Sequence, residues 1–154
     1  MRRITTPLTQ EIIQTLKVRD EILLSGYIYT ARDQAHKRLV EAIKNNKKLP
    51  VDLQNKIIYY CGPTNTPKDK VIGSCGPTTS SRMDKFTPEL LKIGLKGMIG
   101  KGVRSLEVVS AIIKFKAVYF LAPAGCGALL AKKIKSVEAV AYKDLGPEAI
   151  RRLE

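Results

Sequence analysis

Residues 25–38 read SGYIYTARDQAHKR and join an apolar strand directly to a helix. The run from 21 to 29 is almost continuously apolar and has the length of a strand. From about Ala31 to Ile43, apolar residues recur at three- and four-residue spacing, which predicts a helix with one buried stripe. This strand–helix unit suggests the pattern that the rest of the chain follows.

Helices and strands alternate over most of the remaining sequence. We expect further strands at 57–60, 71–72, 97–99, 116–121 and 137–142. We expect further helices at 10–16, 87–93, 106–113 and 127–134, and a last short helix starting at Pro147. The helix at 106–113 is apolar most of the way round, so it should be buried on more than one side. Strands joined by helices predict a single α/β domain over residues 1–154, with a parallel or mixed sheet.

The composition is that of an ordinary globular domain. The 154 residues are 44% hydrophobic and 27% charged, which excludes a disordered or fibrous chain. No apolar run approaches the ~18 residues that a membrane-spanning helix needs. The basic start lacks the apolar stretch of a signal peptide. We therefore expect a cytoplasmic protein that does not enter a membrane.

The net charge of +13 is the unusual property of the chain. Such an excess favours an anionic partner, which could be nucleic acid, a small anion or an acidic protein surface. Aromatic residues make up only 6% and tryptophan is absent, so stacking surfaces for nucleic acid are poorly supplied. We therefore do not expect a nucleic-acid partner.

The residues that usually bind metals are sparse. There are three cysteines, Cys61, Cys75 and Cys126, with no Cys-x-x-Cys pair, and one histidine. These numbers favour neither a disulfide framework nor a zinc site, and we expect no metal bound by this chain alone. The glycine-rich phosphate and dinucleotide motifs are also incomplete.

Two stretches carry the residues best suited to bind an anion. Arg32 falls in the predicted first helical turn, where a cation opposes the helix dipole but free N–H groups would help it hold an anion. In 71–84, which reads VIGSCGPTTSSRMD, four consecutive hydroxyl residues separate a Gly-Pro turn from Arg82. Hydroxyls beside a guanidinium suit a carboxylate. The alternative is a loop whose hydroxyls only satisfy their own backbone.

These stretches, together with Gly97-Met98-Ile99-Gly100-Lys101-Gly102, closely resemble the β subunit of class I iron–sulfur fumarate hydratases and L(+)-tartrate dehydratases. The shared motifs are Thr-Ala-Arg-Asp-x-Ala-His-Lys-Arg, Gly-Pro-Thr-Thr-x-x-Arg-Met-Asp and Gly-Lys-Gly, in that order. In single-chain members the same unit is the C-terminal domain. The resemblance implies a three-layer β/β/α domain of the swivelling type, with a mixed sheet.

The resemblance also implies roles for individual residues. Thr78 matches the catalytic base. The family positions that hold the substrate carboxylates match Arg32, Thr79, Arg82 and Lys101, and Ser80 is a further expected contact. Asp33 and His36 match the motif, and whether they are functional or structural stays open.

The implied enzyme is a hydro-lyase made of two chains, which interconverts fumarate and (S)-malate. Its 4Fe–4S cluster is expected on a partner α subunit, in a two-plus-two assembly, so this chain should be inactive alone. The alternative is the β subunit of an L(+)-tartrate dehydratase, which converts tartrate to oxaloacetate. A more distant alternative is a non-catalytic basic binding module.

Overall fold

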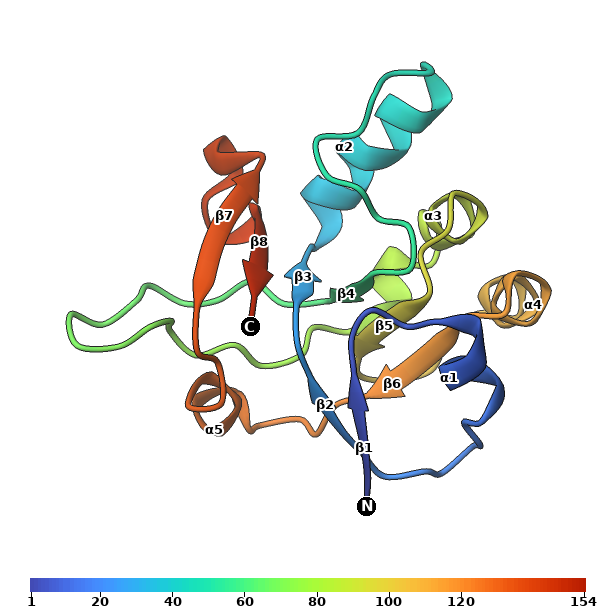
Figure 1. Cartoon of the computed structure of the whole chain (residues 1–154). Helices are drawn as coiled ribbons and strands as arrows, with labels where there is room; N and C mark the ends of the chain where they lie inside the picture. Colours follow the sequence, from blue (N-terminus) through green and yellow to red (C-terminus); the bar gives the residue numbers. More distant parts are fainter.

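The computed structural model describes all residues from 1 to 154, and Figure 1 shows its arrangement. The strands are β1 (Arg2–Thr5), β2 (Ile22–Ser25), β3 (Ile28–Thr30), β4 (Ile57–Tyr59), β5 (Gly97–Gly100), β6 (Val118–Leu121), β7 (Val137–Ala141) and β8 (Ile150–Leu153). The helices are α1 (Gln10–Gln14), α2 (Asp33–Lys44), α3 (Thr87–Lys92), α4 (Leu106–Phe115) and α5 (Gly127–Ala131), with 3₁₀ helices η1 (Ser80–Met83) and η2 (Lys143–Glu148).

The main sheet is mixed, which confirms the expected fold class. Its six strands lie in the order β6-β5-β4-β3-β8-β7. Neighbours from β6 to β3 are parallel, whereas β8 is antiparallel to both β3 and β7. A separate parallel pair is formed by β1 and β2. The carboxyl ends of β3, β4, β5 and β6 therefore meet at one edge of the sheet.

Alternation along the central strands divides the core between the two faces of the sheet. In β4, Ile58 packs with Leu39 of α2 and Leu90 of α3, in a cluster on the helical side. Its neighbour Ile57 packs in a separate cluster with Ile4 of β1. Successive strand residues point to opposite faces, so one strand contributes to both clusters. The result is a layer of helices, the main sheet, and a small second sheet with α1.

The apolar run from 21 to 29 forms two strands instead of the one predicted. The break is at Gly26, whose φ of 103° lies in the left-handed region that favours glycine. Just before it, the Ser25 carbonyl accepts a bond from the Thr6 N–H, with N and O 2.9 Å apart. A side chain at Gly26 would collide with Thr6. The chain thus leaves the small sheet at β2 and enters the main sheet at β3.

Two other predicted elements are wrong. Residues 71–72 form no strand, although Ile72 is buried. Pro147 starts no final helix, because it lies inside η2 and the chain then continues into β8. The four residues of β8 read Ile-Arg-Arg-Leu and do not alternate between apolar and polar, so no local pattern indicates a strand. The backbone of β8 is instead satisfied by pairing with β3 and β7.

The helix α4 is largely exposed, contrary to the expectation that it is buried on more than one side. Only Val108 and Ala111 are buried, whereas Leu106 is 86% and Ile113 72% exposed. The helix contacts α3 along one face and lies at the periphery of the domain (Figure 1). None of the helices has the length and apolar character required to cross a bilayer.

Candidate active site

The candidate residues gather where the parallel strands end. Arg32 and Asp33 follow β3, Gly62 follows β4, and Lys101 follows β5. Thr79 is brought to the same edge by a parallel bridge to Lys101. Ligands of open α/β sheets bind outside the carboxyl ends of the strands, so this edge is the natural place for a site. The two stretches singled out in the sequence are therefore neighbours in space.

Arg32 is the N-cap residue of α2, with extended backbone angles, and not part of the predicted first turn. Its side chain is one-quarter exposed, and its Nε is buried without a hydrogen-bond partner. The side chain lies over Gly62, where an added Cβ would come within 2.9 Å of both Cδ and Nη1. Its one ion-pair contact is with Asp33, where Nε lies 4.0 Å from Oδ1, so the exposed part of the guanidinium is available to a ligand.

Arg82 pairs with Asp33 through two contacts. Its Nε is 3.1 Å from Oδ2 and its Nη2 is 3.0 Å from Oδ1 of that carboxylate. A guanidinium carries five N–H donors, so this grip leaves Nη1 free for a second anion. The structure thus joins Arg82 to the Arg32 side of the site through Asp33.

Thr78, Thr79 and Ser80 form a segment, here called the Thr78 segment, that runs beside β4 and β5. The Thr78 N–H donates to the Tyr60 carbonyl, with N and O 2.7 Å apart, and the Ser80 N–H donates to the Lys101 carbonyl at 3.0 Å. Thr78 is half-buried, Thr79 is exposed and Ser80 is completely buried. Thr79 therefore faces solvent, whereas the Ser80 side chain packs in the interior beneath the segment.

Lys101 lies between two glycines, and we call residues 100–102 the Lys101 loop. Its side chain is half-buried and belongs to none of the ion pairs in the structure. Gly100 packs against Ser80 and Tyr60 so closely that a Cβ would collide with both. Gly102 has a φ of 83° and open space beside it. The loop thus brings an unpaired cation close to the Thr78 segment.

His36 is completely buried under the start of α2. Its Nδ1 is 2.7 Å from the Arg32 carbonyl oxygen, and its Nε2 has no partner. The ring packs edge-on against Tyr60, with centroids 5.4 Å apart. Burial lowers the pKa of His36 to about 4, so the ring is neutral at pH 7 and donates from Nδ1. In this arrangement His36 holds the backbone of Arg32 in place.

Four residues that the sequence analysis did not single out connect these parts: Tyr60, Asp84, Arg104 and Tyr119. The Tyr119 hydroxyl is hydrogen-bonded to Ser80 Oγ at 2.7 Å and to the Gly102 carbonyl at 2.8 Å. Asp84 accepts a bond from Arg104 Nε at 2.7 Å and another from the Ser105 N–H at 2.9 Å. The only sequence signals were the place of Asp84 in the second motif and of Arg104 just after Gly-Lys-Gly.

The cysteines do not fit an iron–sulfur cluster. Cys61 and Cys75 are buried together, and hydrogen bonding to Cys75 together with burial raises the pKa of the Cys61 thiol. The Cys126 thiol lies 2.8 Å from the Pro123 carbonyl instead. No three histidine, cysteine, aspartate or glutamate side chains lie close enough together to hold a metal ion.

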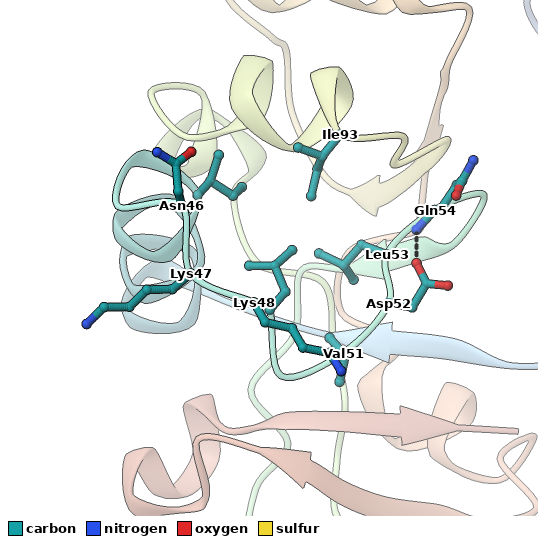
Figure 2. Close-up of a pocket in the computed structure, with 10 residues that line it drawn as sticks. Asn46, Lys47, Lys48, Val51, Asp52, Leu53, Gln54 and Ile93 are labelled. Carbon is teal, nitrogen blue, oxygen red and sulfur yellow. Dashed lines mark hydrogen bonds between the residues drawn. The ribbon is translucent and has the colours of Figure 1, made fainter.

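A surface depression lies away from this edge, between the end of α2 and the loop that follows it (Figure 2). Its lining includes the apolar residues Ile93, Leu53 and Val51 and the basic residues Lys47 and Lys48. None of the candidate site residues lines it.

Known proteins match almost the whole chain. The family model described as "Fumarase C-terminus" matches residues 2–154. A putative L(+)-tartrate dehydratase subunit beta from Methanocaldococcus jannaschii is 43% identical over 96% of this chain and 78% of the relative. The L(+)-tartrate dehydratase subunit beta of Escherichia coli K12 is 38% identical over 96% and 74%. An aerobic class I fumarate hydratase from the same bacterium is 38% identical over the full chain but only 28% of the relative.

Proposed function

Because this chain belongs to the fumarase C-terminus family, we propose that it is the β subunit of a two-chain hydro-lyase acting on a four-carbon dicarboxylate. The named relatives are dehydratases and a hydratase, which are lyases, and two are designated β subunits. The observation that carries the proposal is the meeting of Arg32, Lys101 and the Thr78 segment at one edge of the sheet. We assign all of residues 1–154 to this one domain and the protein to the cytoplasm.

The proposed substrate is a dianion, and the site supplies cations for both of its carboxylates. Arg32 Nε makes no hydrogen bond and lies 4.0 Å from Asp33 Oδ1, and Lys101 belongs to no ion pair. Arg82 keeps Nη1 free beyond its pair with Asp33. Charge-assisted bonds from guanidinium to carboxylate are among the strongest that side chains make. Thr79, which is exposed beside Lys101, adds a hydroxyl donor.

We assign the base to Thr78. Removing water from malate breaks a C–O bond on one carbon and a C–H bond on its neighbour. The leaving hydroxide would be accepted by the cluster of the partner subunit as a Lewis acid, and Thr78 would accept the proton. A threonine hydroxyl is a weak base unless its surroundings favour the ionised form. The positive charges of Arg32, Arg82 and Lys101 would favour the ionised form of the Thr78 hydroxyl. The main-chain bond from Thr78 to Tyr60 holds the residue in a defined position.

The proposal places the iron–sulfur cluster on a partner α subunit, since the cysteines of this chain do not fit one. An exposed apolar stripe supports such a partner. It starts at Val103, two residues after Lys101, and continues along α4 through Leu106 and Ile113. Exposed apolar surface of this kind commonly marks a protein interface. The net charge of +13 suits an acidic partner surface.

Two substrates are candidates. Fumarate and malate are supported by the similarity to a class I fumarate hydratase. L(+)-tartrate is favoured by a specific observation, since two relatives that match over about three-quarters of their own length are tartrate dehydratase β subunits. The same carboxylate-binding residues would serve either substrate.

The test is to co-express the chain with its candidate cluster-bearing subunit, purify the complex without oxygen, and assay both substrates. Loss of fumarate absorbance only when both chains are present would identify a split fumarate hydratase. Turnover of tartrate but not of fumarate would support the two-chain hydro-lyase and identify tartrate as its substrate. An intact, cluster-loaded complex inactive toward both would refute the proposal.

A further inference from the structure

Arg104 lies behind the candidate site and is almost inaccessible, with its side chain 2% exposed. Its Nε donates to Asp84 Oδ1 at 2.7 Å and its Nη2 donates to Thr87 Oγ1 at 2.8 Å. The guanidinium also stacks on two rings, 5.1 Å from the centroid of Tyr60 and 4.9 Å from that of Tyr119. A buried cation held by this many groups has one allowed position.

Tyr60 and Tyr119 are each hydrogen-bonded to a part of the candidate site. The carbonyl of Tyr60 accepts the Thr78 N–H, and the Tyr119 hydroxyl bonds to Ser80 Oγ and to the Gly102 carbonyl. Tyr119 thus links the Thr78 segment to the Lys101 loop through its hydroxyl. Arg104 stacks on both rings and therefore contacts both of these links.

The same two parts of the site are also joined directly. The Ser80 N–H donates to the Lys101 carbonyl at 3.0 Å, and the Lys101 N–H approaches the Thr78 carbonyl at 3.4 Å. The longer of these bonds is near the limit of hydrogen-bond length. The 3.0 Å bond holds Ser80 against Lys101, whereas the longer one leaves Thr78 itself less firmly paired with Lys101.

We propose that Arg104, acting through Tyr119, is a positioning residue that fixes the Thr78 segment relative to the Lys101 loop. This inference rests on the proposed function, in which Thr78 is the base and Lys101 binds substrate. Arg104 itself touches no substrate, because it is buried. Its charge is balanced by Asp84, which also accepts the N–H of Ser105 at the start of α4.

The first test needs no activity. Amide hydrogen exchange at Thr78, Ser80 and Lys101 is compared between the wild-type chain and the variants Arg104→Lys and Tyr119→Phe. Lysine keeps the charge but cannot bond Asp84 and Thr87 while lying flat between two rings. Phenylalanine keeps the ring and removes only the linking hydroxyl. We expect these amides to exchange about tenfold faster in both variants.

Matched controls come from a similar pair elsewhere. Arg38 bonds both oxygens of Asp144 and stacks over Tyr142, 5.3 Å from the ring centroid, and these contacts involve neither the Thr78 segment nor the Lys101 loop. Arg38→Lys and Tyr142→Phe should leave exchange at the three site amides unchanged. If Arg104→Lys does not fold, Tyr119→Phe still tests whether the Tyr119 hydroxyl holds the Thr78 segment against the Lys101 loop.

The second test uses the assembled enzyme. We expect Arg104→Lys and Tyr119→Phe to lower kcat about ten- to hundredfold while KM changes less than threefold. Carboxylates are attracted over several ångströms, whereas a proton transfer fails when the base shifts by a fraction of that distance. A loss of stability alone would lower the amount of enzyme and leave both constants of the folded fraction unchanged.

The outcomes separate this inference from the proposed function. Unchanged exchange at the three amides in both variants would overturn the positioning role, whatever the activity. Faster exchange with unchanged kcat would also overturn it, because the restraint would then not matter for turnover. If the wild-type complex turns over neither substrate, the proposed function fails, and the exchange result still shows whether Arg104 orders the two segments.

Discussion

Arg82 is paired with Asp33 through one hydrogen bond, from Nε to Oδ2 at 3.1 Å, and one ion-pair contact, between Nη2 and Oδ1 at 3.0 Å. The pair joins η1 to the first residue of α2 and ties together the two sequence stretches that were predicted to bind substrate. Arg82 is half-exposed, and Nη1 takes no part in the pair. Asp33 can therefore hold the guanidinium in place while Arg82 still contacts an incoming carboxylate.

Arg82→Lys should weaken substrate binding because one ammonium cannot bond Asp33 at two points and still reach the substrate. We expect KM of the assembled enzyme to rise at least tenfold, with a smaller fall in kcat. Steady-state kinetics with fumarate and tartrate would measure both constants. Arg38→Lys, which breaks a similar pair with Asp144, is the control. An unaltered KM would remove Arg82 from the binding site.

Thr78→Ala should abolish most of the turnover while the complex still assembles. Loss of a general base lowers rates by about 10²- to 10⁴-fold. The main-chain bond from Thr78 to Tyr60 survives in the variant, so the backbone should stay in place. Single-turnover rates and gel filtration would be compared with Thr66→Ala, an exposed position outside the site. An unchanged rate would exclude Thr78 as the base.

Gly62→Ala should disturb Arg32 without unfolding the domain. The added Cβ would lie 2.9 Å from Arg32 Cδ and Nη1, which a flexible side chain can relieve by moving, and 3.3 Å from the Pro147 carbonyl oxygen, which needs a shift of a few tenths of an ångström. We expect KM to rise several-fold and the unfolding temperature to change by only a few degrees. Gly76→Ala is the control, since its nearest contact would be an ordinary 3.6 Å. Equal effects of the two substitutions on KM would contradict this assignment.

Acid should destabilise the domain through His36. Burial lowers the pKa of His36 to about 4 from an ordinary 6.5, with Asp33 and the Arg32 carbonyl opposing the shift and Arg104 reinforcing it. Between these values the unfolded chain binds a proton that the folded chain does not. Stability is therefore lost as pH falls from 6.5 towards 4, by about 3 kcal/mol in total from this group.

Urea unfolding at several pH values between 7.5 and 4 would measure that loss. The variant His36→Gln keeps a side-chain donor for the Arg32 carbonyl but does not titrate. We expect its stability to fall less steeply over the same range, although its stability at pH 7.5 is lower because the histidine ring is lost from the core. Parallel curves for the two proteins would show that His36 does not contribute to acid sensitivity.

The exposed stripe of α4 should carry part of the contact with the partner subunit. We expect Leu106→Ser and Ile113→Ser together to weaken complex formation at least tenfold and to leave the unfolding temperature of this chain nearly unchanged, because both side chains are exposed. Leu129→Ser on α5, at a position 60% exposed, is the control. Titration calorimetry would compare the affinities. Unimpaired binding would place the interface elsewhere.

Much of the fold could be predicted from local patterns. The helix after Arg32, the strands at 57–60 and 97–99, and the helix opened by Pro88 all have strong local signals, and the structure contains each of them. The break at Gly26 and the strand β8 could not be predicted in this way. Both depend on partners distant in sequence, namely Thr6 for the first, and β3 and β7 for the second.

The sequence by itself determined which residues are available for chemistry. The motifs around Arg32, Thr78 and Lys101 identified the family, on which the proposed dicarboxylate chemistry rests, because residue types at close spacing can be read along the chain. Only the tertiary structure decided how they are held. Ser80 is covered by Gly100 and bonded to Tyr119, Arg82 is tied to Asp33, and Arg104 lies buried between two tyrosines. Such contacts join residues from different strands and helices, and packing alone brings those elements together.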